Sequence, residues 1–420
     1  MSLALIDRQT SFPGWAAVAP ALATAALLLG GSGAGASGPA RLLAIKPMTW
    51  IGQRSYSIYL WHWPAIVFAK VLWPVGSISA PIAALAVTFV GASVSYVWVE
   101  QPVRRSRLLA NSRHRSIALA GCMTLASATI AIVAVASFMH FSRQPSQLAI
   151  AEAIDTYPVA SGSTHKCLVL FADAGLTECA FGRTIHPQKT IVLFGDSHAD
   201  HWSTPLVDIA DKRGWRVITL LKAFCPAIAS DVYVERLHRV SSECVQWRSS
   251  AMERIAGLHP DLVVIGEASS AYVTSKWNVG DRHAVASEDW ATAMAATVNT
   301  LTAAGIPVLI MRDTPRADES SAVCLARVVW RGGDPGRCAL VRTAAIDDRV
   351  ANAERAAAAS ARTASYQDWT DAFCDRERCP AVIDGVIVYR DSNHISDAFA
   401  SHLAPALEQA IDRAMAKVSK

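Results

Sequence analysis

The sequence predicts an α-helical bundle of transmembrane segments followed by an α/β domain with a three-layer, doubly wound parallel sheet. Three observations predict this combination. Four long apolar stretches precede residue 145, and short β-branched runs alternate with helical segments after residue 189. In addition, 52% of the 420 residues are hydrophobic, which is high for a wholly soluble protein. We therefore divide the chain into a membrane domain (residues 1–140), a linker (141–188) and an α/β domain (189–420).

The four apolar stretches span residues 15–30, 56–73, 80–99 and 117–139. Each approaches the roughly 20 residues that a helix needs to cross a bilayer, although the first is short and the second contains Pro64. We expect about four transmembrane helices, with the lipid bilayer as a partner. The alternative is a buried helical core.

The basic residues predict the orientation of these helices. The loop VEQPVRRSRLLANSRHRS, between the third and fourth stretches, carries five arginines and is therefore expected in the cytoplasm. Alternation then places Arg41, Lys46 and Arg54 inside as well, and everything after residue 140 outside. This grouping indicates membrane topology, so no nucleic-acid partner is expected.

Eight of the nine cysteines follow residue 160, and they form four close couples along the chain. An even number confined to one region favours disulfides in an oxidising compartment, which agrees with the outside placement. Structural zinc is the alternative, but the spacings contain no pair of CxxC knuckles. The candidate couples are Cys167 with Cys179, Cys225 with Cys244, Cys324 with Cys338, and Cys374 with Cys379.

Four short apolar runs after residue 189 are typical of buried parallel strands. Alanine-rich segments at 287–304 and 342–362 have the composition of helices that cover a sheet. Because functional sites of such sheets lie at the carboxyl ends of the strands, the residues that follow each run are candidates. The runs are TIVLFG (190–195), RVITLL (216–221), DLVVIG (261–266) and PVLIMR (307–312).

The first run ends in Gly195, Asp196 and Ser197, and near the C-terminus Asp391 and His394 stand three residues apart. A serine hydroxyl becomes a nucleophile when a base takes its proton and a third group orients that base. On a tight turn the Asp391 carboxylate can reach the imidazole Nδ1 of His394, which leaves Nε2 to face Ser197. The sequence therefore predicts a catalytic triad of Ser197, His394 and Asp391, with the Ser197 N–H at a helix start as an oxyanion donor.

Other roles remain open for these residues. Ser197 alone could be a helix cap, and Asp196 is expected to bond loop amides near it. His198 and His201 are expected to be surface or packing residues. The GDSH and NH pairs also resemble metallophosphoesterase motifs, but the D-x-H and G-H-x-H motifs of that class are missing, so no metal is expected.

The motif GDSH at 195–198 together with DSNH at 391–394 resembles the SGNH (GDSL-like) superfamily of hydrolases and acyltransferases. Upstream, WIGQRSYSIYLWHWP at 50–64 and VEQPVRR at 99–105 resemble the closing helices of the acyltransferase 3 membrane family, whose members often carry a fused periplasmic SGNH domain. The resemblance implies an SGNH hydrolase-like fold, a periplasmic linker over residues 141–188, and Ser197, His394 and Asp391 as catalytic residues.

The same resemblance implies a bacterial inner-membrane O-acyltransferase. Ser197 would accept an acyl group, expected to be acetyl, and pass it to a hydroxyl of a cell-envelope glycan such as lipopolysaccharide or another polysaccharide. No cofactor is expected to be bound, and the acyl donor is expected to be acetyl-CoA at the cytoplasmic face of an intact membrane domain. The alternatives are a periplasmic carbohydrate acetyl esterase and an inactive membrane-anchored module.

The chain also departs from these families. Family members have about ten membrane helices, and SLALIDRQTSFPGW (2–15) resembles the middle of their membrane domain. We therefore expect either a fragment or a second chain that supplies the other helices; His62 is expected to be an interfacial structural residue. In DLVVIGEASS, Gly266 stands where the superfamily has an oxyanion asparagine block, and it is a candidate second oxyanion donor beside Ser197.

Overall fold

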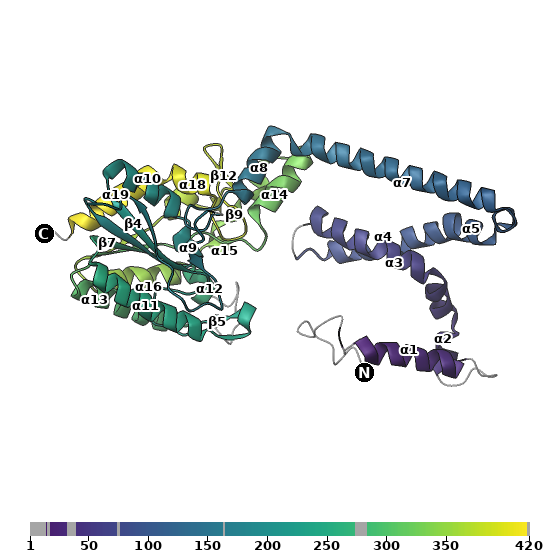
Figure 1. Ribbon diagram of the computed structural model, residues 1–420, viewed down its shortest axis with the longest axis horizontal. Coiled ribbons are helices and arrows are strands. Elements are labelled where there is room, and N and C mark those ends of the chain that lie inside the picture. The colour runs from purple at the N-terminus through teal and green to yellow at the C-terminus, as the bar shows by residue number, and fades with distance from the viewer. Residues whose placement is uncertain are drawn as a thin grey trace. The chain divides into compact units, whose positions relative to one another are not determined.

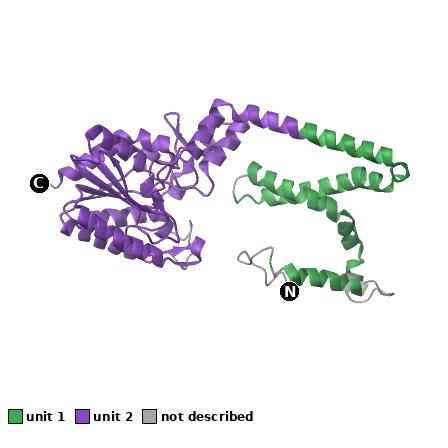
Figure 2. Ribbon diagram, in the orientation of Figure 1, with its two compact units in different colours: residues 1–130 green, residues 131–420 purple. Residues whose placement is uncertain are grey.

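The computed structural model describes residues 14, 17–31, 39–73, 76–162, 164–273 and 284–417 (Figure 1). The chain divides into two compact units, Met1–Ile130 and Ala131–Lys420 (Figure 2). The N-terminal segment that resembles the middle of the family's membrane domain lies outside the described residues, apart from Gly14.

Helices make up the described part of the first unit. A π-helical turn, η3, joins α4 to α5, so these three elements form one continuous rod; α7 begins in this unit and ends in the second. The elements are α1 (Val18–Gly31), α2 (Pro39–Leu43), α3 (Lys46–Leu72), α4 (Ser79–Ser95), η3 (Tyr96–Glu100), α5 (Gln101–Arg105), α6 (Arg107–Ala110) and α7 (Arg113–Ser142).

Two helices among the described residues are long and apolar enough to cross a membrane, Ser79–Arg105 with 27 residues and Arg113–Ser142 with 30. They match the third and fourth predicted stretches. Within the described residues the first stretch forms the 14-residue α1, shorter than the roughly 20 residues of a span, and α3 carries Arg54, Pro64 and Lys70 along its length. No residue of α7 is buried by protein, unlike the core helix of a soluble protein. The structure thus supports two of the four predicted spans.

The tryptophan-rich motif at 50–64 packs α3 against α4. The Trp61 indole donates a hydrogen bond from Nε1 to Ser95 Oγ at 2.8 Å, and a Cβ on Gly91 would lie 2.6 Å from the same indole. Gly91 is therefore the residue that lets the two helices approach around this ring. His62 makes only a local contact, from Nδ1 to the Tyr59 carbonyl at 2.6 Å.

The second unit is built on a seven-stranded sheet. Six strands run parallel in the order β1-β4-β3-β7-β8-β10, and β2 pairs antiparallel with β4. Every residue of β3, β7 and β8 is buried, as expected for apolar strands covered on both faces. The strands are β1 (Leu168–Val169), β2 (Cys179–Gly182), β3 (Thr190–Gly195), β4 (Arg216–Lys222), β7 (Leu262–Gly266), β8 (Val308–Met311) and β10 (Ala364–Gln367).

Helices cover both faces of this sheet (Figure 1). Alternate residues of β3 point to opposite sides, so Ile191 and Leu193 join one hydrophobic cluster, and Val192 and Phe194 join the other. The first cluster includes residues of α10 (Ser203–Arg213), α18 (Asp397–His402) and α19 (Ala404–Ala416). The second includes residues of α11 (Ser242–Leu258), α13 (Ser287–Ala303) and α16 (Asp348–Ala359). The predicted three-layer α/β fold is confirmed.

Short elements complete the second unit. They connect the strands and helices already described or form two-stranded sheets separate from the seven-stranded one. The helical ones are α8 (Pro145–Asp155), α9 (Ser197–Asp200), η4 (Glu235–Leu237), α12 (Ser269–Val273), α14 (Ser321–Trp330), η5 (Pro335–Cys338), α15 (Arg342–Ala345) and α17 (Thr370–Phe373). The strand pairs are β5 (Tyr233–Val234) with β6 (Arg239–Val240), β9 (Leu340–Val341) with β11 (Arg378–Cys379), and β12 (Val382–Ile383) with β13 (Val386–Ile387).

All four predicted strands are present, but the three other strands of the seven-stranded sheet, β1, β2 and β10, were missed. Strands β1 and β2 lie within residues 141–188, so the α/β domain begins before residue 189 and the predicted linker is too long at its C-terminal end. The predicted helix over 342–362 breaks into α15 and α16, because Asp347 accepts a hydrogen bond from the Arg349 N–H and caps the second helix.

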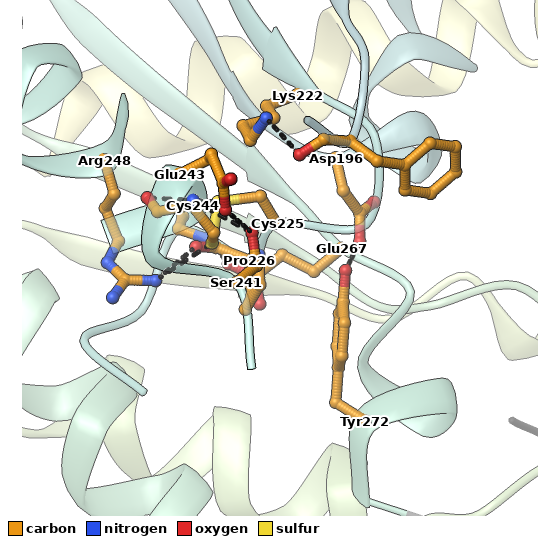
Figure 3. Close-up of a disulfide and its surroundings, with 12 residues drawn as sticks. Asp196, Lys222, Cys225, Pro226, Ser241, Glu243, Cys244, Arg248, Glu267 and Tyr272 are labelled. Atoms are coloured by element: carbon orange, nitrogen blue, oxygen red, sulfur yellow. Dashed lines mark hydrogen bonds between the residues drawn. A yellow bond between two sulfur atoms is a disulfide. The ribbon is translucent and has the colours of Figure 1, made fainter. Parts of the chain in front are cut away.

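The four predicted disulfides are all formed. Each joins cysteines that are neighbours in the cysteine order, with sequence separations of 12, 19, 14 and 5 residues. The bond between Cys225 and Cys244 ties the segment after β4 to the start of α11 (Figure 3). Cys122 in α7 is a free cysteine.

Candidate active site

The carboxyl end of β3 places the candidate nucleophile at the point where the strand order reverses. The chain passes from β3 to β4 on one side and later continues to β7 on the other side of β3, and ligand sites of doubly wound sheets lie at such points. Gly195 ends the strand with φ +146°, and a Cβ there would lie 2.0 Å from the Gly266 carbonyl oxygen. Only glycine fits this turn, which delivers Ser197 to the first position of α9.

Asp196 stabilises the turn between β3 and α9 through hydrogen bonds of its carboxylate. Its Oδ1 accepts a hydrogen bond from the His198 N–H at 2.8 Å and caps α9, while Oδ2 accepts from the Ala268 N–H at 3.0 Å and from the Tyr272 hydroxyl at 2.6 Å. The carboxyl group is fully buried, and burial raises the pKa of Asp196. Asp196 therefore bonds loop amides beside Ser197, as the sequence predicted.

A disulfide and a buried glutamate support the neighbouring loop. Glu267, directly after β7, accepts a hydrogen bond at Oε1 from the Ala227 N–H at 2.7 Å, and Ala227 lies two residues beyond Cys225. Figure 3 shows Glu267, Arg248 and Tyr272 around the Cys225–Cys244 bond. Burial raises the pKa of Glu267 well above its ordinary value. These contacts fix the loop after β4 against the end of β7.

The structure brings the three predicted catalytic residues together. His394 Nε2 lies 3.0 Å from Ser197 Oγ, and His394 Nδ1 lies 2.8 Å from Asp391 Oδ2. Asp391 Oδ1 also accepts hydrogen bonds from the N–H groups of Asn393 and His394, at 2.9 and 2.7 Å. The local turn therefore fixes the carboxylate, which in turn orients the imidazole. This is the nucleophile, base and orienting-group geometry that acyl transfer requires.

The environment of the triad sets the protonation states of His394 and Asp391. Burial is the main cause that lowers the pKa of His394, and the hydrogen bond that His394 donates to Asp391 opposes it only in part. Burial would raise the pKa of Asp391, but the hydrogen bond and charge of His394, with the two backbone amides, lower it overall. At neutral pH His394 is therefore the neutral base and Asp391 the carboxylate.

His198 and His201 do not lie on the surface. Their exposed fractions are 3% and 1%, and both rings lie beside His394, with ring centroids 5.1 and 5.0 Å from it. Of the two expected roles, surface or packing residue, the surface position is excluded for both histidines, and their burial agrees with the packing role. Burial lowers the pKa of His201 well below its ordinary value.

Asp313 is a polar residue of this site that was not predicted from the sequence. It follows β8 and Arg312, and its Oδ1 lies 2.6 Å from His198 Nδ1. Its carboxylate also accepts from Thr314 N–H at 2.8 Å and from Ser270 N–H at 3.0 Å, and it contacts Ser270 Oγ. An aspartate just after a buried strand, in MRDTP, was the available signal.

The structure gives Gly266 a packing role. A Cβ at Gly266 would lie 2.8 Å from Ala199 Cα, so the glycine lets α9 approach β7. Two other amides near Ser197 are already engaged, because Asp196 accepts the N–H groups of His198 and Ala268. The Ser197 and Gly266 N–H groups as oxyanion donors stay predictions.

Comparison with known proteins places this geometry in a family. A family model described as "SGNH domain (fused to AT3 domains)" matches residues 166–409, more than half of the chain. The chain belongs to this family. Its match begins just before Cys167 and β1, in agreement with a domain that starts before residue 189.

Curated relatives match over short segments. The chain is 40% identical over 71 residues to the peptidoglycan O-acetyltransferase OatA of Listeria monocytogenes, covering 16% of this chain and 11% of the relative. It is 40% identical over 68 residues to O-acetyltransferase OatA of Staphylococcus aureus (16% and 11%) and 39% identical over 77 residues to the putative peptidoglycan O-acetyltransferase YrhL of Bacillus subtilis (17% and 12%). The chain thus spans only about a ninth of the length of the curated relatives it matches.

Among solved structures, the periplasmic domain of the lipopolysaccharide acetyltransferase of Salmonella ser. Paratyphi A aligns with 55% of this chain and 86% of its own. The identity is 14% and the TM-score 0.42. Family membership, the two candidate membrane helices and the four disulfides together indicate a membrane-anchored protein whose SGNH domain lies outside the cytoplasm.

Proposed function

We propose that this SGNH domain is an O-acyltransferase that forms an acyl ester on Ser197 and passes the acyl group to a hydroxyl of a cell-envelope glycan. The observation that carries the proposal is the contact of His394 Nε2 with Ser197 Oγ at 3.0 Å while Asp391 holds Nδ1. The names of the relatives, peptidoglycan O-acetyltransferases, support acetyl as the acyl group and a glycan as the acceptor.

The chemistry follows from the positions of the three side chains. In the first step Ser197 Oγ attacks the acyl carbonyl carbon, and its proton passes to His394 Nε2; the imidazolium then protonates the leaving group as the carbonyl re-forms. In the second step His394 takes the proton of a glycan hydroxyl, whose oxygen attacks the acyl-serine and releases Ser197 Oγ, which regains the proton. Asp391 stabilises the imidazolium in both steps without leaving its two backbone amides.

The acyl group reaches Ser197 from the membrane side in this proposal. The donor is acetyl-CoA at the cytoplasmic face, and helices beyond those of the described chain, whether on the same polypeptide or on a second one, carry the acyl group across. The membrane is the bacterial inner membrane and the domain lies in the periplasm. The four disulfides support an oxidising compartment of this kind.

A serine-directed reagent tests the nucleophile. The full chain, purified in detergent, is incubated with a fluorescent fluorophosphonate, which labels only serines activated by a base. We expect labelling of the wild type, its loss in Ser197→Ala, and wild-type labelling in Ser250→Ala, a control on the exposed face of α11. Equal labelling of the wild type and Ser197→Ala would refute Ser197 as the nucleophile, and no labelling of either would favour an inactive module.

The acceptor is tested separately from the nucleophile. The same protein is given an activated acetyl ester together with peptidoglycan fragments or lipopolysaccharide oligosaccharides, and both acetylated glycan and free acetate are measured. Transfer to glycan that depends on Ser197 supports the proposal. Free acetate that depends on Ser197, with no acetylated glycan from any acceptor, would show instead that water is the acceptor and the domain is an esterase.

A further inference from the structure

Three histidine rings gather beside the candidate nucleophile. The ring centroids of His198 and His201 are 4.6 Å apart, and each lies about 5 Å from that of His394. One ring nitrogen of each residue can be chosen so that the three nitrogens all lie within 4.8 Å of one another. His198 and His201 come from the turn after β3, whereas His394 comes from the segment before α18, so the fold and not one local motif brings them together.

Two of these rings are already oriented by carboxylates. His198 Nδ1 contacts Asp313 Oδ1 at 2.6 Å, and His394 Nδ1 contacts Asp391 Oδ2 at 2.8 Å. In both residues the carboxylate occupies Nδ1, so Nε2 is the nitrogen that can ligate a metal; His198 Nε2 has no partner among the described residues, and His394 Nε2 contacts Ser197 Oγ. A carboxylate on the far nitrogen is the usual support of a metal-binding histidine, because it fixes the tautomer and makes the ligating nitrogen more basic.

His201 supplies an independent sign of a missing partner. Its side chain is 1% exposed, and neither ring nitrogen makes a hydrogen bond to a residue that the structure describes; the same is true of His198 Nε2. Leaving a buried polar atom without a partner costs roughly 1–3 kcal/mol. Two such residues side by side, both facing a third histidine, are therefore a costly arrangement for a packing role alone.

The size of the cluster fits a small cation. In a triangle whose sides are all 4.8 Å, each corner lies about 2.8 Å from the centre, so the three nitrogens lie no further than about 2.8 Å from a common point. Zinc binds imidazole nitrogen at about 2.0–2.1 Å. Side-chain movements of at most about 0.7 Å would close the site. The ligand set of three neutral imidazoles suits Zn²⁺ and similar divalent transition metals.

We propose that His198, His201 and His394 form a binding site for a divalent transition-metal ion such as Zn²⁺, and that its occupancy switches the active site off. The second part rests on the proposed function. His394 Nε2 has one lone pair, which either accepts the Ser197 proton or ligates the metal, so a bound ion removes the base and leaves Ser197 unactivated. The ion acts as a reversible inhibitor of acyl transfer and not as its cofactor.

Binding is measured first, without any reference to activity. The full chain in detergent is stripped with a chelator and titrated with Zn²⁺ in competition with a chromophoric zinc indicator. We expect one tight equivalent in the wild type, and at least a hundredfold weaker binding in His201→Phe, which keeps a flat ring of similar size but removes both nitrogens. His186→Phe, at an exposed position, is the matched control and should bind like the wild type.

Folding of the variant is checked by thermal unfolding, and His201→Asn is the second variant if His201→Phe is unstable. Absence of a tight equivalent in the wild type, or equal binding by the wild type and both His201 variants, would overturn the metal site.

Fluorophosphonate labelling of Ser197 then tests the switch. We expect stoichiometric Zn²⁺ to suppress labelling of the wild type at least tenfold, chelator to restore it, and His201→Phe to be labelled equally with and without the ion. Tight zinc binding with unchanged or faster labelling would overturn the inhibitory role. A stripped wild type that is not labelled at all would count against the proposed function, while the zinc titration would still decide the metal site.

Discussion

Gly266→Ala tests whether close packing beneath α9 sets the position of the nucleophile. The new Cβ would lie 2.8 Å from Ala199 Cα and 3.2 Å from Ala199 N, both backbone atoms two residues after Ser197. Ordinary van der Waals contact at such a site begins at 3.4 Å, so α9 must move away from β7 by about 0.6 Å to restore it. Rotation of a flexible side chain cannot relieve this clash.

The movement has two expected costs. Overpacking of a buried site by one methyl group destabilises a protein by about 1–3 kcal/mol. Because Ser197 and Ala199 share one turn of helix, Oγ also moves relative to His394 Nε2, and misplacement of a reacting group by about 1 Å costs on the order of a hundredfold in rate. We expect Gly266→Ala to unfold at lower temperature and to react with fluorophosphonate roughly tenfold to a hundredfold more slowly.

Gly257→Ala is the matched control. Gly257 is an exposed residue within α11, and a Cβ there would meet nothing within 4 Å. Alanine is favoured over glycine inside a helix by about 0.5–1 kcal/mol, so this variant should be slightly more stable and equally reactive. Thermal unfolding and labelling rates of both variants check the reasoning. A Gly266→Ala protein as stable and as reactive as the wild type would refute it.

Three further predictions concern the charges of the site. Asp391→Asn should slow fluorophosphonate labelling by about 10³–10⁴-fold, because an amide orients the wrong tautomer of His394; a loss below tenfold would contradict the triad. Burial lowers the pKa of His394, so its neutral form persists below pH 6.5; the labelling rate should fall to half only at a pH below 6.5, and a midpoint above that value would count against His394 as the base. Burial raises the pKa of Asp200 to about 6 from 3.8. Between pH 3.8 and pH 6 the folded state therefore binds more protons than the unfolded state. The wild type loses stability as the pH rises through this range. Asp200→Asn should therefore be up to about 3 kcal/mol more stable than the wild type at pH 8 and show no advantage at pH 4 in thermal unfolding; an equal difference at both pH values would exclude this cause.

The strands that the sequence revealed are those with apolar side chains on both faces. β3, β4, β7 and β8 lie in the middle of the sheet, and their continuous β-branched runs reflect burial on both sides. β10 reads ASYQ and is only half buried at an edge, and β1 and β2 have two and four residues. Such strands carry too little periodic signal to be distinguished from loops.

The triad could be predicted because each of its parts leaves a local signal in the sequence. Ser197 follows a recognisable strand, and Asp391 and His394 are close enough in sequence to contact each other within one turn. The partnership of His198 with Asp313 depends on how β3 and β8 are ordered in the sheet, with β7 between them. Sequence spacing carries no information about that order, so the sequence could not show whether His198 and His201 were surface or packing residues.

The transmembrane spans were predicted less well than the sheet, because an apolar stretch does not show where the helix that contains it begins and ends. The second stretch belongs to a 27-residue helix that also contains Arg54, and its Trp61 donates a hydrogen bond to Ser95 of another helix. Trp61 packs against α4, so an aromatic-rich run here serves helix association as much as insertion.

The pairing of each cysteine with the next one along the chain has a consequence for biogenesis. No bridge encloses or interleaves with another, and none spans more than 19 residues. A polypeptide that crosses the membrane from its N-terminal side exposes both members of one couple before the next couple emerges. An oxidase that joins thiols in their order of arrival therefore produces the native set directly, and export of this domain should not depend on an enzyme that reshuffles wrong bridges.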